Sequence, residues 1–419
     1  MATLLKRQGI DVPLLVFALL LTVYGIAMVF SAGQTDAVSG SYATLWQRQL
    51  AFFAVALCLA YAIMQGSVRL IEWAAWPLYL FSCGLLVLVL FVGTGAGTAA
   101  GMKSWLSIGG YRIGQPAELA KLATILMLAR VLAARRESPR ALLELWQPLL
   151  VVAVPWLLVL AQKDVGTAIV FIGICFGMLF WAGVSWPVLL MLASPGISLL
   201  LAFSTGAWGA WFLLLGALML WYRPYLLEGA ALMLANVTMG IVAPILWERL
   251  APYQQRRLLV FLDPSYDPRN AGWNVVQSKV AIGSGGIFGN GFTLGSQKRL
   301  QFLPERHTDF IFSVVGEELG FIGVSIALSL FLALFLRTTR VASRASDAFP
   351  SLVAMGILAA WMVHVIVNIG MTLNLMPVTG IPLPFFSNGG SFLMVSWMSV
   401  AVLLRISAEG RGLPEGLGL

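Results

Sequence analysis

Two aspartates, Asp263 and Asp267, lie four residues apart in the stretch FLDPSYDPRNAGWNVVQSK, and a proline follows each of them. Proline disfavours the α conformation in the residue before it, so both carboxylates should lie on turns. Such a carboxylate can cap a turn, which suits Asp263, or it can act as a general base. A general base must be ionised and within hydrogen-bond reach of a hydroxyl, and nearby cations would bind an anionic substrate.

Charged side chains in two earlier motifs could supply part of such a site. In GMKSWLSIGGYRIGQPAELAKLA, Glu118 and Lys121 are three residues apart, on one face of a helix that has a proline in its first turn. An intrahelical ion pair is the alternative explanation. Lys103 and Arg112 precede this helix, and Asp164 follows it in the motif AQKDVGTA. We expect these groups on the outer side of the membrane or just inside it.

A third motif, FLPERHTDFIFSVVGEELG, crowds ionisable residues between a proline and a predicted helix: Glu305, Arg306, His307 and Asp309. Thr308 or Asp309 could cap that helix. Glu317 and Glu318 follow inside an apolar run. Ionisable groups at membrane depth are costly, so by default they indicate function. The alternative is a polar helix end that packs against cations of the loop.

Two segments rich in glycine or proline lie near these motifs. AIGSGGIFGNGFTLGS lacks the Gly-Lys-Ser/Thr ending of a Walker loop, so it predicts either a flexible loop or a close approach of backbones. MPVTGIPLPFFSNGG is a broken connector. Broken backbone at membrane depth is tolerated only where it is buried in protein or lines a cavity.

Together these motifs predict one outward-facing cavity that holds cations and one or two carboxylates. Arginine and lysine would hold phosphates there. A carboxylate would activate an acceptor hydroxyl. Such a cavity suits a lipid-linked pyrophosphate whose sugar reaches the outside.

The composition places this cavity in a membrane protein. Of the 419 residues, 59% are hydrophobic and 11% charged, and the mean hydropathy is +0.89. We therefore expect an all-α polytopic fold with a single integral membrane domain, 1–419. No CxxC or His-rich spacing occurs, which argues against haem, iron–sulfur and structural zinc. The net charge of +8 suits cytoplasmic loops and anionic membrane lipid rather than nucleic acid.

Apolar runs long enough to be membrane spans, or nearly so, predict about twelve helices. They lie at 12–30, 48–65, 73–93, 116–134, 148–162, 165–182, 187–204, 207–222, 229–248, 309–336, 351–374 and 388–405. An even count places both termini on one side. Arginines in the fourth-to-fifth and tenth-to-eleventh loops make that side cytoplasmic. The segment 249–308 is then a large extracytoplasmic loop. It is too apolar for disorder, so we expect it to pack on the helices and form part of the site.

DPSYDPRNAGWNVVQSKVAIGSGGIFGNGF, QFLPERHTDFIFSVVGEELGFIG and MPVTGIPLPFFSNGGS resemble the SEDS family (shape, elongation, division and sporulation). The likeness covers nearly the whole chain and is greatest to the rod-shape branch, RodA. It implies a peptidoglycan glycosyltransferase in the bacterial cytoplasmic membrane that polymerises lipid II into undecaprenyl-linked glycan on the outer face. It also implies a class B penicillin-binding protein as partner within the elongation machinery. We allow for a divalent cation, Mg²⁺ or Mn²⁺, and expect no organic cofactor.

The resemblance also assigns roles to individual residues. The family's essential acid maps onto Asp267, so the catalytic motif lies in the 249–308 loop. The polar face of the fourth helix maps onto Glu118 and Lys121, the tryptophan of the preceding loop onto Trp105, and the acid between the fifth and sixth helices onto Asp164. Further candidates for substrate binding are Lys103, Lys279, Glu305, Arg306 and His307.

The sequence departs from the family pattern in a few places. Ser104 stands where a basic residue usually precedes the tryptophan. Lys163 and Val165 replace the proline and the leucine that usually flank the acid at Asp164, and Asn388 replaces a tyrosine. The family has ten spanning helices, so we interpret 185–225, which carries no family motif, as an inserted helical pair. Two added helices preserve the sidedness of the downstream loop.

Two other functional classes remain open from the sequence alone. A lipid II flippase would also use many helices and buried ions, but its polar groups should line a path through the membrane, whereas these cluster on the outer half. A non-catalytic scaffold would leave the acid site without a purpose. Within the family, the division and sporulation branches are alternatives to elongation.

Overall fold

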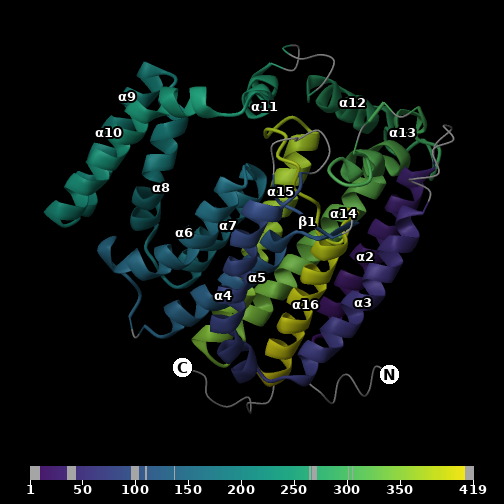
Figure 1. The fold of residues 1–419 in the computed structure, drawn as a ribbon, viewed down its shortest axis with the longest axis horizontal. Coiled ribbons are helices and arrows are strands. Elements are labelled where there is room, and N and C mark those ends of the chain that lie inside the picture. The colour runs from purple at the N-terminus through teal and green to yellow at the C-terminus, as the bar shows by residue number, and fades with distance from the viewer. Residues whose placement is uncertain are drawn as a thin grey trace.

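The computed structural model describes residues 10–34, 44–95, 103–108, 111–135, 137–263, 266, 271–300, 302–303 and 305–410. These residues form a bundle of helices with one small hairpin (Figure 1). The long helices are α2 (Val12–Gly33), α3 (Leu45–Gln65), α4 (Val68–Val92), α5 (Pro116–Ala133), α6 (Trp146–Ala161), α7 (Val165–Trp181), α8 (Trp186–Leu201), α9 (Thr205–Tyr222), α10 (Leu226–Arg249), α14 (Ile311–Ser343), α15 (Ala348–Thr372) and α16 (Gly390–Gly410). The shorter elements are β1 (Leu106–Ile108), β2 (Tyr111–Gly114), η1 (Leu143–Leu145), α11 (Pro252–Leu262), α12 (Ala271–Ser284) and α13 (Ser296–Arg299).

The long helices coincide with the predicted apolar runs, and the all-α membrane fold is confirmed. In the described ranges, nine helices are long and apolar enough to cross a membrane, and α7 and α8 are shorter apolar helices. Helix α5 is the remaining long helix, and it carries three charged residues. The number of membrane spans stays a prediction.

The centre of the bundle is formed by α5, α15 and α16. Most of α15 and α16 is buried, and every residue of α5 from Pro116 to Ala129 except Leu119 is buried. Since most of their surface packs against other helices, buried polar side chains on them must find partners inside the protein. This central position makes α5 and α15 the natural place for a polar site.

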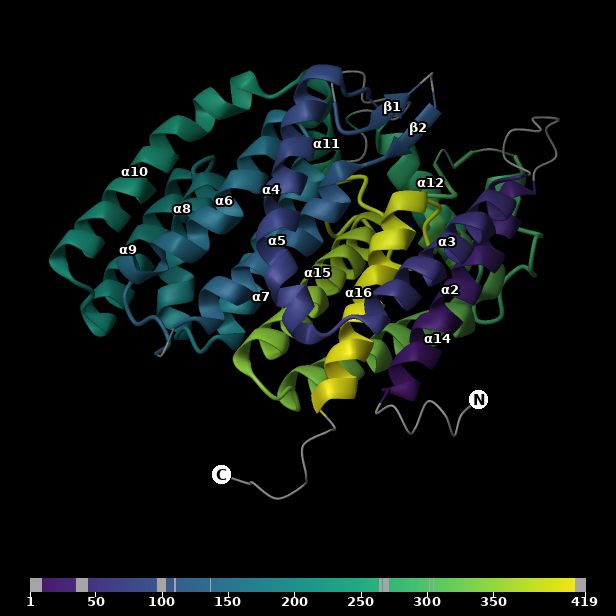
Figure 2. The ribbon, with the colours of Figure 1, turned by 60° about the horizontal axis from the view of Figure 1, so that its bottom comes forward.

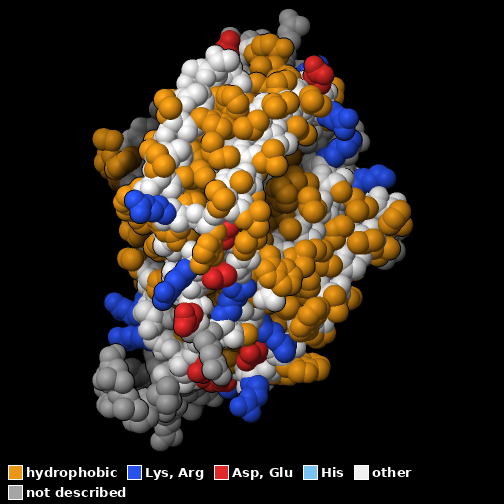
Figure 3. All heavy atoms as spheres, turned by 90° about the vertical axis from the view of Figure 1, so that its left-hand side faces the viewer, with side chains coloured by type: hydrophobic (Ala, Val, Ile, Leu, Met, Phe, Trp, Pro, Cys, Tyr) orange, Lys and Arg blue, Asp and Glu red, His pale blue; other side chains and the backbone are white. Residues whose placement is uncertain are grey.

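Helices α8, α9 and α10 lie together at one side of the bundle (Figures 1 and 2). Residues 185–225, the predicted inserted pair, fold as α8 and α9. Their ends meet where Trp186 stacks on Trp221 at 5.5 Å between ring centroids. Hydrophobic side chains cover most of this face, and charged ones gather mainly in its lower half (Figure 3). That distribution suits a surface in contact with lipid.

The predicted sidedness agrees with the layout of the described helices. Helix α2 begins and α16 ends at the lower end of the bundle, whereas α11, α12 and α13 lie at the upper end (Figure 1). The 249–308 segment contains these three helices. It packs on the bundle, where Ser278 Oγ lies 2.6 Å from Ser313 Oγ and 2.7 Å from the Thr372 carbonyl oxygen. Which end faces the cytoplasm stays a prediction.

The glycine-rich stretch after α12 lies against the point where α14 is broken. The break is at Gly320, whose φ of 60° and ψ of −156° are not helical. The amides of Asn290 and Gly291 each donate to a carbonyl of the glutamate pair, at 3.0 Å. A Cβ at Gly289 would lie 2.1 Å from the Glu318 carbonyl oxygen. The glycines therefore allow two backbones to approach closely, and the flexible-loop interpretation is wrong.

We expect Gly289→Ala to destabilise the protein strongly. Its φ of +80° is strained for alanine, and the added methyl group would overlap the backbone of α14. Each effect costs about 1–3 kcal/mol. Thermal unfolding in detergent, followed by tryptophan fluorescence, measures the loss. Gly283→Ala is the matched control, because nothing lies within 4 Å of a Cβ there. Equal melting temperatures for the two variants would contradict the packing argument.

The two glutamates in α14, Glu317 and Glu318, bind the segment that follows α12 and packs against the break in α14. Glu318 forms a buried ion pair with Lys298 of α13, and Lys298 Nζ also donates to the Ser31 carbonyl at 2.8 Å. Glu317 Oε1 accepts from the Gln297 amide at 2.8 Å and from Ser296 Oγ at 3.2 Å. The pair thus fixes the loop to α2 and α14, which favours the structural interpretation of these acids over a functional one.

Candidate active site

Helix α5 carries the strongest candidate site because it places two opposite charges inside the bundle. The helix starts at Pro116, and the preceding residue, Gln115, anchors the start by donating its amide to Ser391 Oγ at 3.3 Å. Glu118 and Lys121 then lie one turn apart. Lys121 Nζ is 2.7 Å from Glu118 Oε2, and both side chains are at most 5% exposed. The predicted pair therefore exists, and it is buried.

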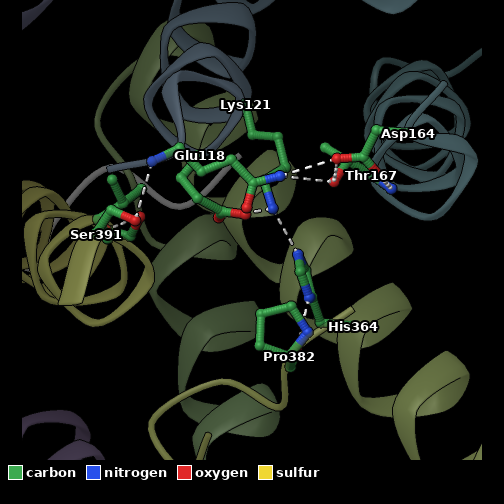
Figure 4. A network of polar contacts seen from close by, with 10 residues as sticks. Glu118, Lys121, Asp164, Thr167, His364, Pro382 and Ser391 are labelled. Atoms are coloured by element: carbon green, nitrogen blue, oxygen red, sulfur yellow. Dashed lines mark hydrogen bonds and ion pairs between the residues drawn. The ribbon is translucent and has the colours of Figure 1, made fainter. Parts of the chain in front are cut away.

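A histidine from a distant helix completes the pair. His364 of α15 places Nε2 2.7 Å from Lys121 Nζ, and its Nδ1 lies 2.9 Å from the carbonyl oxygen of Pro382 (Figure 4). Lys121 also lies 5.4 Å from the centroid of the Phe392 ring. A cavity of about 30 Å³ adjoins Glu118, Lys121 and His364, which is room for about one water molecule.

Asp164 joins this network through the start of α5. It caps α7 by accepting from the Thr167 amide at 3.0 Å and from Thr167 Oγ1 at 2.9 Å. Its Oδ2 also accepts from Gln115 Nε2 at 2.9 Å. Carboxylates stabilise helix starts in this way. The structure therefore places Asp164 beside the start of the helix that carries Glu118 and Lys121 (Figure 4), and the substrate-binding roles of the three residues stay a prediction.

Trp105 and Lys103 lie in the connection that leads to α5. Trp105 exchanges backbone hydrogen bonds with Thr94, at 2.9 and 3.2 Å, just after α4. Lys103 is exposed, and its Nζ is 3.5 Å from the Leu90 carbonyl oxygen. The hairpin of β1 and β2 then leads into Gln115. These contacts hold both residues at the upper end of the bundle, without a direct contact to Glu118 or Lys121 among the described residues.

The motif of residues 305–309 lies beside the broken connector rather than on the α5 pair. The amide of Asn388 donates to the His307 carbonyl at 2.9 Å. Arg306 is buried and donates through Nε to the Ala32 carbonyl at 3.0 Å. His307 Nε2 is 3.9 Å from Glu305 Oε2. Burial lowers the pKa of His307, an effect that Glu305 opposes and Arg306 reinforces. The other predicted cation, Lys279, is exposed on α12.

The predicted catalytic acid, Asp267, lies outside the described residues, in the sequence between α11 and α12. Asp263 ends α11, where its amide donates to the Leu259 carbonyl at 2.8 Å. This bond is made by the backbone, so the capping role of the Asp263 carboxylate stays a prediction. The choice of Asp267 as the base stays a prediction.

Sequence reasoning missed His364, Gln115 and Ser391. His364 is one of two histidines in the chain and falls in the predicted span 351–374. An ionisable residue at membrane depth indicates function by default. Asn368, one turn further on the same face, was a second polar residue in this span. In the structure its amide group donates to the carbonyls of Asp309 and Ile381 at 3.1 and 2.8 Å.

Asp309 should give the folded protein a measurable pH dependence. Burial raises the pKa of Asp309 to about 6, with a further rise from Glu305, while Arg257 acts in the opposite direction. Because the folded pKa exceeds the unfolded one, its contribution to stability is full below pH ~4 and is lost as the pH rises through about 6. In Asp309→Asn, thermal unfolding should lose this part of the pH dependence, and the variant should gain a few degrees over wild type at pH 7. If the melting temperatures of Asp309→Asn and wild type differ by the same amount at pH 4.5 and at pH 7, the prediction is wrong.

Comparisons with known proteins identify the family and the fold. A profile described as FTSW_RODA_SPOVE, cell cycle protein, matches residues 12–412. The chain is 34% identical over 416 residues to the peptidoglycan glycosyltransferase MrdB of Escherichia coli K12, which covers 99% of this chain and 98% of MrdB.

Two solved structures are similar over the whole fold. One is a chain from a peptidoglycan synthase complex described for its structural coordination of polymerization and crosslinking. It matches with a TM-score of 0.69 and 28% identity, and the match covers 95% of this chain and 97% of that one. The other is the rod shape determining protein RodA of Thermus thermophilus, with a TM-score of 0.62, 27% identity, and coverage of 95% and 96%.

Proposed function

The chain belongs to the FTSW/RODA/SPOVE family and is a peptidoglycan glycosyltransferase, and we propose that it polymerises lipid II at the outer face of the cytoplasmic membrane during cell elongation. The observation that carries the proposal furthest is the buried network of Glu118, Lys121 and His364. A desolvated ammonium is poorly explained as a stabilising device, since a buried ion pair is often no more stable than an apolar replacement. It is well explained as a fixed charge for an anionic substrate.

In the proposed reaction, Asp267 takes the proton from a hydroxyl of the acceptor sugar. The oxygen attacks the anomeric carbon of the donor, the bond to the pyrophosphate breaks, and the configuration inverts from α to β. The leaving pyrophosphate carries away the bonding electron pair. Fixed positive charge near that group stabilises the transition state, because it needs no reorganisation as charge develops.

Lys121 is the cation best placed for this task inside the bundle, because Glu118 and His364 hold it in one orientation. Lys279 and Arg249 are exposed at the upper end. They would meet the outer part of the substrate, as would Lys103. Arg306 is held by the Ala32 carbonyl, so we assign it to the support of the adjoining turn that carries Glu305 and His307.

The role in elongation rests on the motifs that resemble the RodA branch and on the likeness to the Thermus thermophilus structure. The family description spans division and sporulation as well. Depletion in the source organism separates these branches. Loss of rod shape supports elongation, whereas filaments with failed septa would move the proposal to division.

A class B penicillin-binding protein is the proposed partner. The similar synthase complex couples polymerization to crosslinking, so we propose that this chain makes the glycan and that the partner crosslinks it. A divalent cation stays a prediction. Magnesium often takes one or two carboxylates together with substrate phosphates. The part of the chain that the structure describes contains no group of three or more His, Cys, Asp or Glu residues that could hold a metal, and no step is assigned to one.

The test is polymerisation of purified lipid II by the purified complex, with the partner's transpeptidase site inactivated. Glycan strands should accumulate and undecaprenyl pyrophosphate should be released. Transport of lipid II across vesicles without polymer would instead support a flippase.

A further inference from the structure

His364 is the buried titratable group whose part in the reaction is least evident from the motifs. It lies in the middle of α15 with only 2% of its surface exposed. Its two ring nitrogens contact different parts of the protein: Nε2 faces Lys121 Nζ at 2.7 Å, and Nδ1 faces the Pro382 carbonyl oxygen at 2.9 Å. The ring also packs on Phe392, with 4.8 Å between centroids.

These contacts determine which nitrogen carries the proton. A carbonyl oxygen only accepts, so Nδ1 must donate to Pro382. Lys121 is paired with Glu118 at 2.7 Å, which favours the ammonium form, and an ammonium only donates. Nε2 must therefore accept from Lys121. His364 is thus a neutral imidazole protonated on Nδ1, since an imidazolium would place two like charges in direct contact.

This arrangement fixes the direction of the lysine. Two of the three ammonium hydrogens point at Glu118 and His364, which leaves one for a ligand or water in the adjoining cavity of about 30 Å³. Through Pro382, the same imidazole connects Lys121 to the broken connector that precedes α16. Lys121 has a flexible four-carbon stem, so without a second acceptor it would sample several rotamers.

We propose that His364, protonated on Nδ1, is a positioning residue that holds the Lys121 ammonium in the orientation needed to bind the pyrophosphate of the substrate. The inference rests on the proposed function for its catalytic consequence, but the tautomer and the Lys121 contact can be measured without any activity. A matched pair of substitutions tests the role. Glutamine can accept from Lys121 and donate to Pro382, whereas leucine can do neither.

The kinetic result expected is rescue by glutamine. In the purified complex, His364→Gln should keep kcat within a few-fold of wild type. His364→Leu should lower kcat about 10- to 100-fold, with a smaller change in KM, because the lysine remains but is misplaced. Ser351→Ala controls for lost hydrogen bonds on the same helix, since Ser351 Oγ contacts Trp181 and Ala342 at the other end of α15. Equal activity of His364→Leu and wild type would overturn the inference.

Histidine NMR gives the second readout. The chain has two histidines, so protein with His307→Gln and ¹⁵N-histidine shows His364 alone. We expect the spectrum of a neutral imidazole protonated on Nδ1. The chemical shift of Nε2 should change in Lys121→Met and should not change in Ser351→Ala. An Nε2–H tautomer, an imidazolium or no response to Lys121→Met would refute the assignment. If the spectra agree but wild type makes no polymer, the positioning contact stands and the proposed function falls.

Discussion

Asp267→Asn should remove glycan polymerisation while leaving the complex folded. General acid–base catalysis contributes roughly 10²–10⁴-fold, so a loss in this range is expected if Asp267 is the base. Asparagine keeps the size and most of the turn chemistry of aspartate but cannot take a proton. The measurement is the initial rate of polymer formation from lipid II, with binding to the penicillin-binding protein confirmed for each variant.

Asp263→Asn is the matched control, because it changes the other acid of the same DPSYDP motif. Asp263 is the residue at which α11 ends, and we predict that its carboxylate caps the turn, so its variant should retain most of the rate. The opposite pattern, with Asp263→Asn inactive and Asp267→Asn active, would reassign the base. Retained activity in both variants would place the base outside this motif.

Replacing either member of the α5 pair should cost both stability and activity. Glu118→Gln and Lys121→Met each leave one charge buried without its counter-charge, which costs about 3–5 kcal/mol. Both side chains are at most 5% exposed, so water cannot compensate. We expect a lower melting temperature in detergent and a loss of polymerisation of at least about 100-fold, as for removal of a single transition-state donor.

The double variant, Glu118→Gln with Lys121→Met, separates the two effects. It leaves neither member of the α5 pair as a buried charge without its counter-charge, so much of the lost stability should return, as in other proteins where an apolar or neutral pair replaces a buried ion pair. Activity should not return, because the ammonium is still absent. A stable double variant with near wild-type polymerisation would show that the pair is structural only.

The sequence predicted the features that depend on neighbours along the chain. Helices at runs such as 165–182 and 351–374 follow from length and apolarity, because the backbone of a membrane protein must satisfy its own hydrogen bonds. The Glu118–Lys121 contact follows from a spacing of three residues on a helix. The sidedness of the 249–308 segment relative to the termini followed from the odd numbers of runs on either side of it, nine before and three after, and the layout of the bundle agrees with it.

Tertiary structure decided the contacts between segments far apart in sequence. His364 and Lys121 are 243 residues apart, and Lys298 and Ser31 are 267 apart. No local pattern encodes such pairs. The glycine-rich stretch could equally be flexible or tightly packed until the backbone of α14 was seen beside Gly289. Spacing fixes which residues share a helix face, but only the packing of whole helices fixes which face meets which, and the orientation of Lys121 depends on that packing.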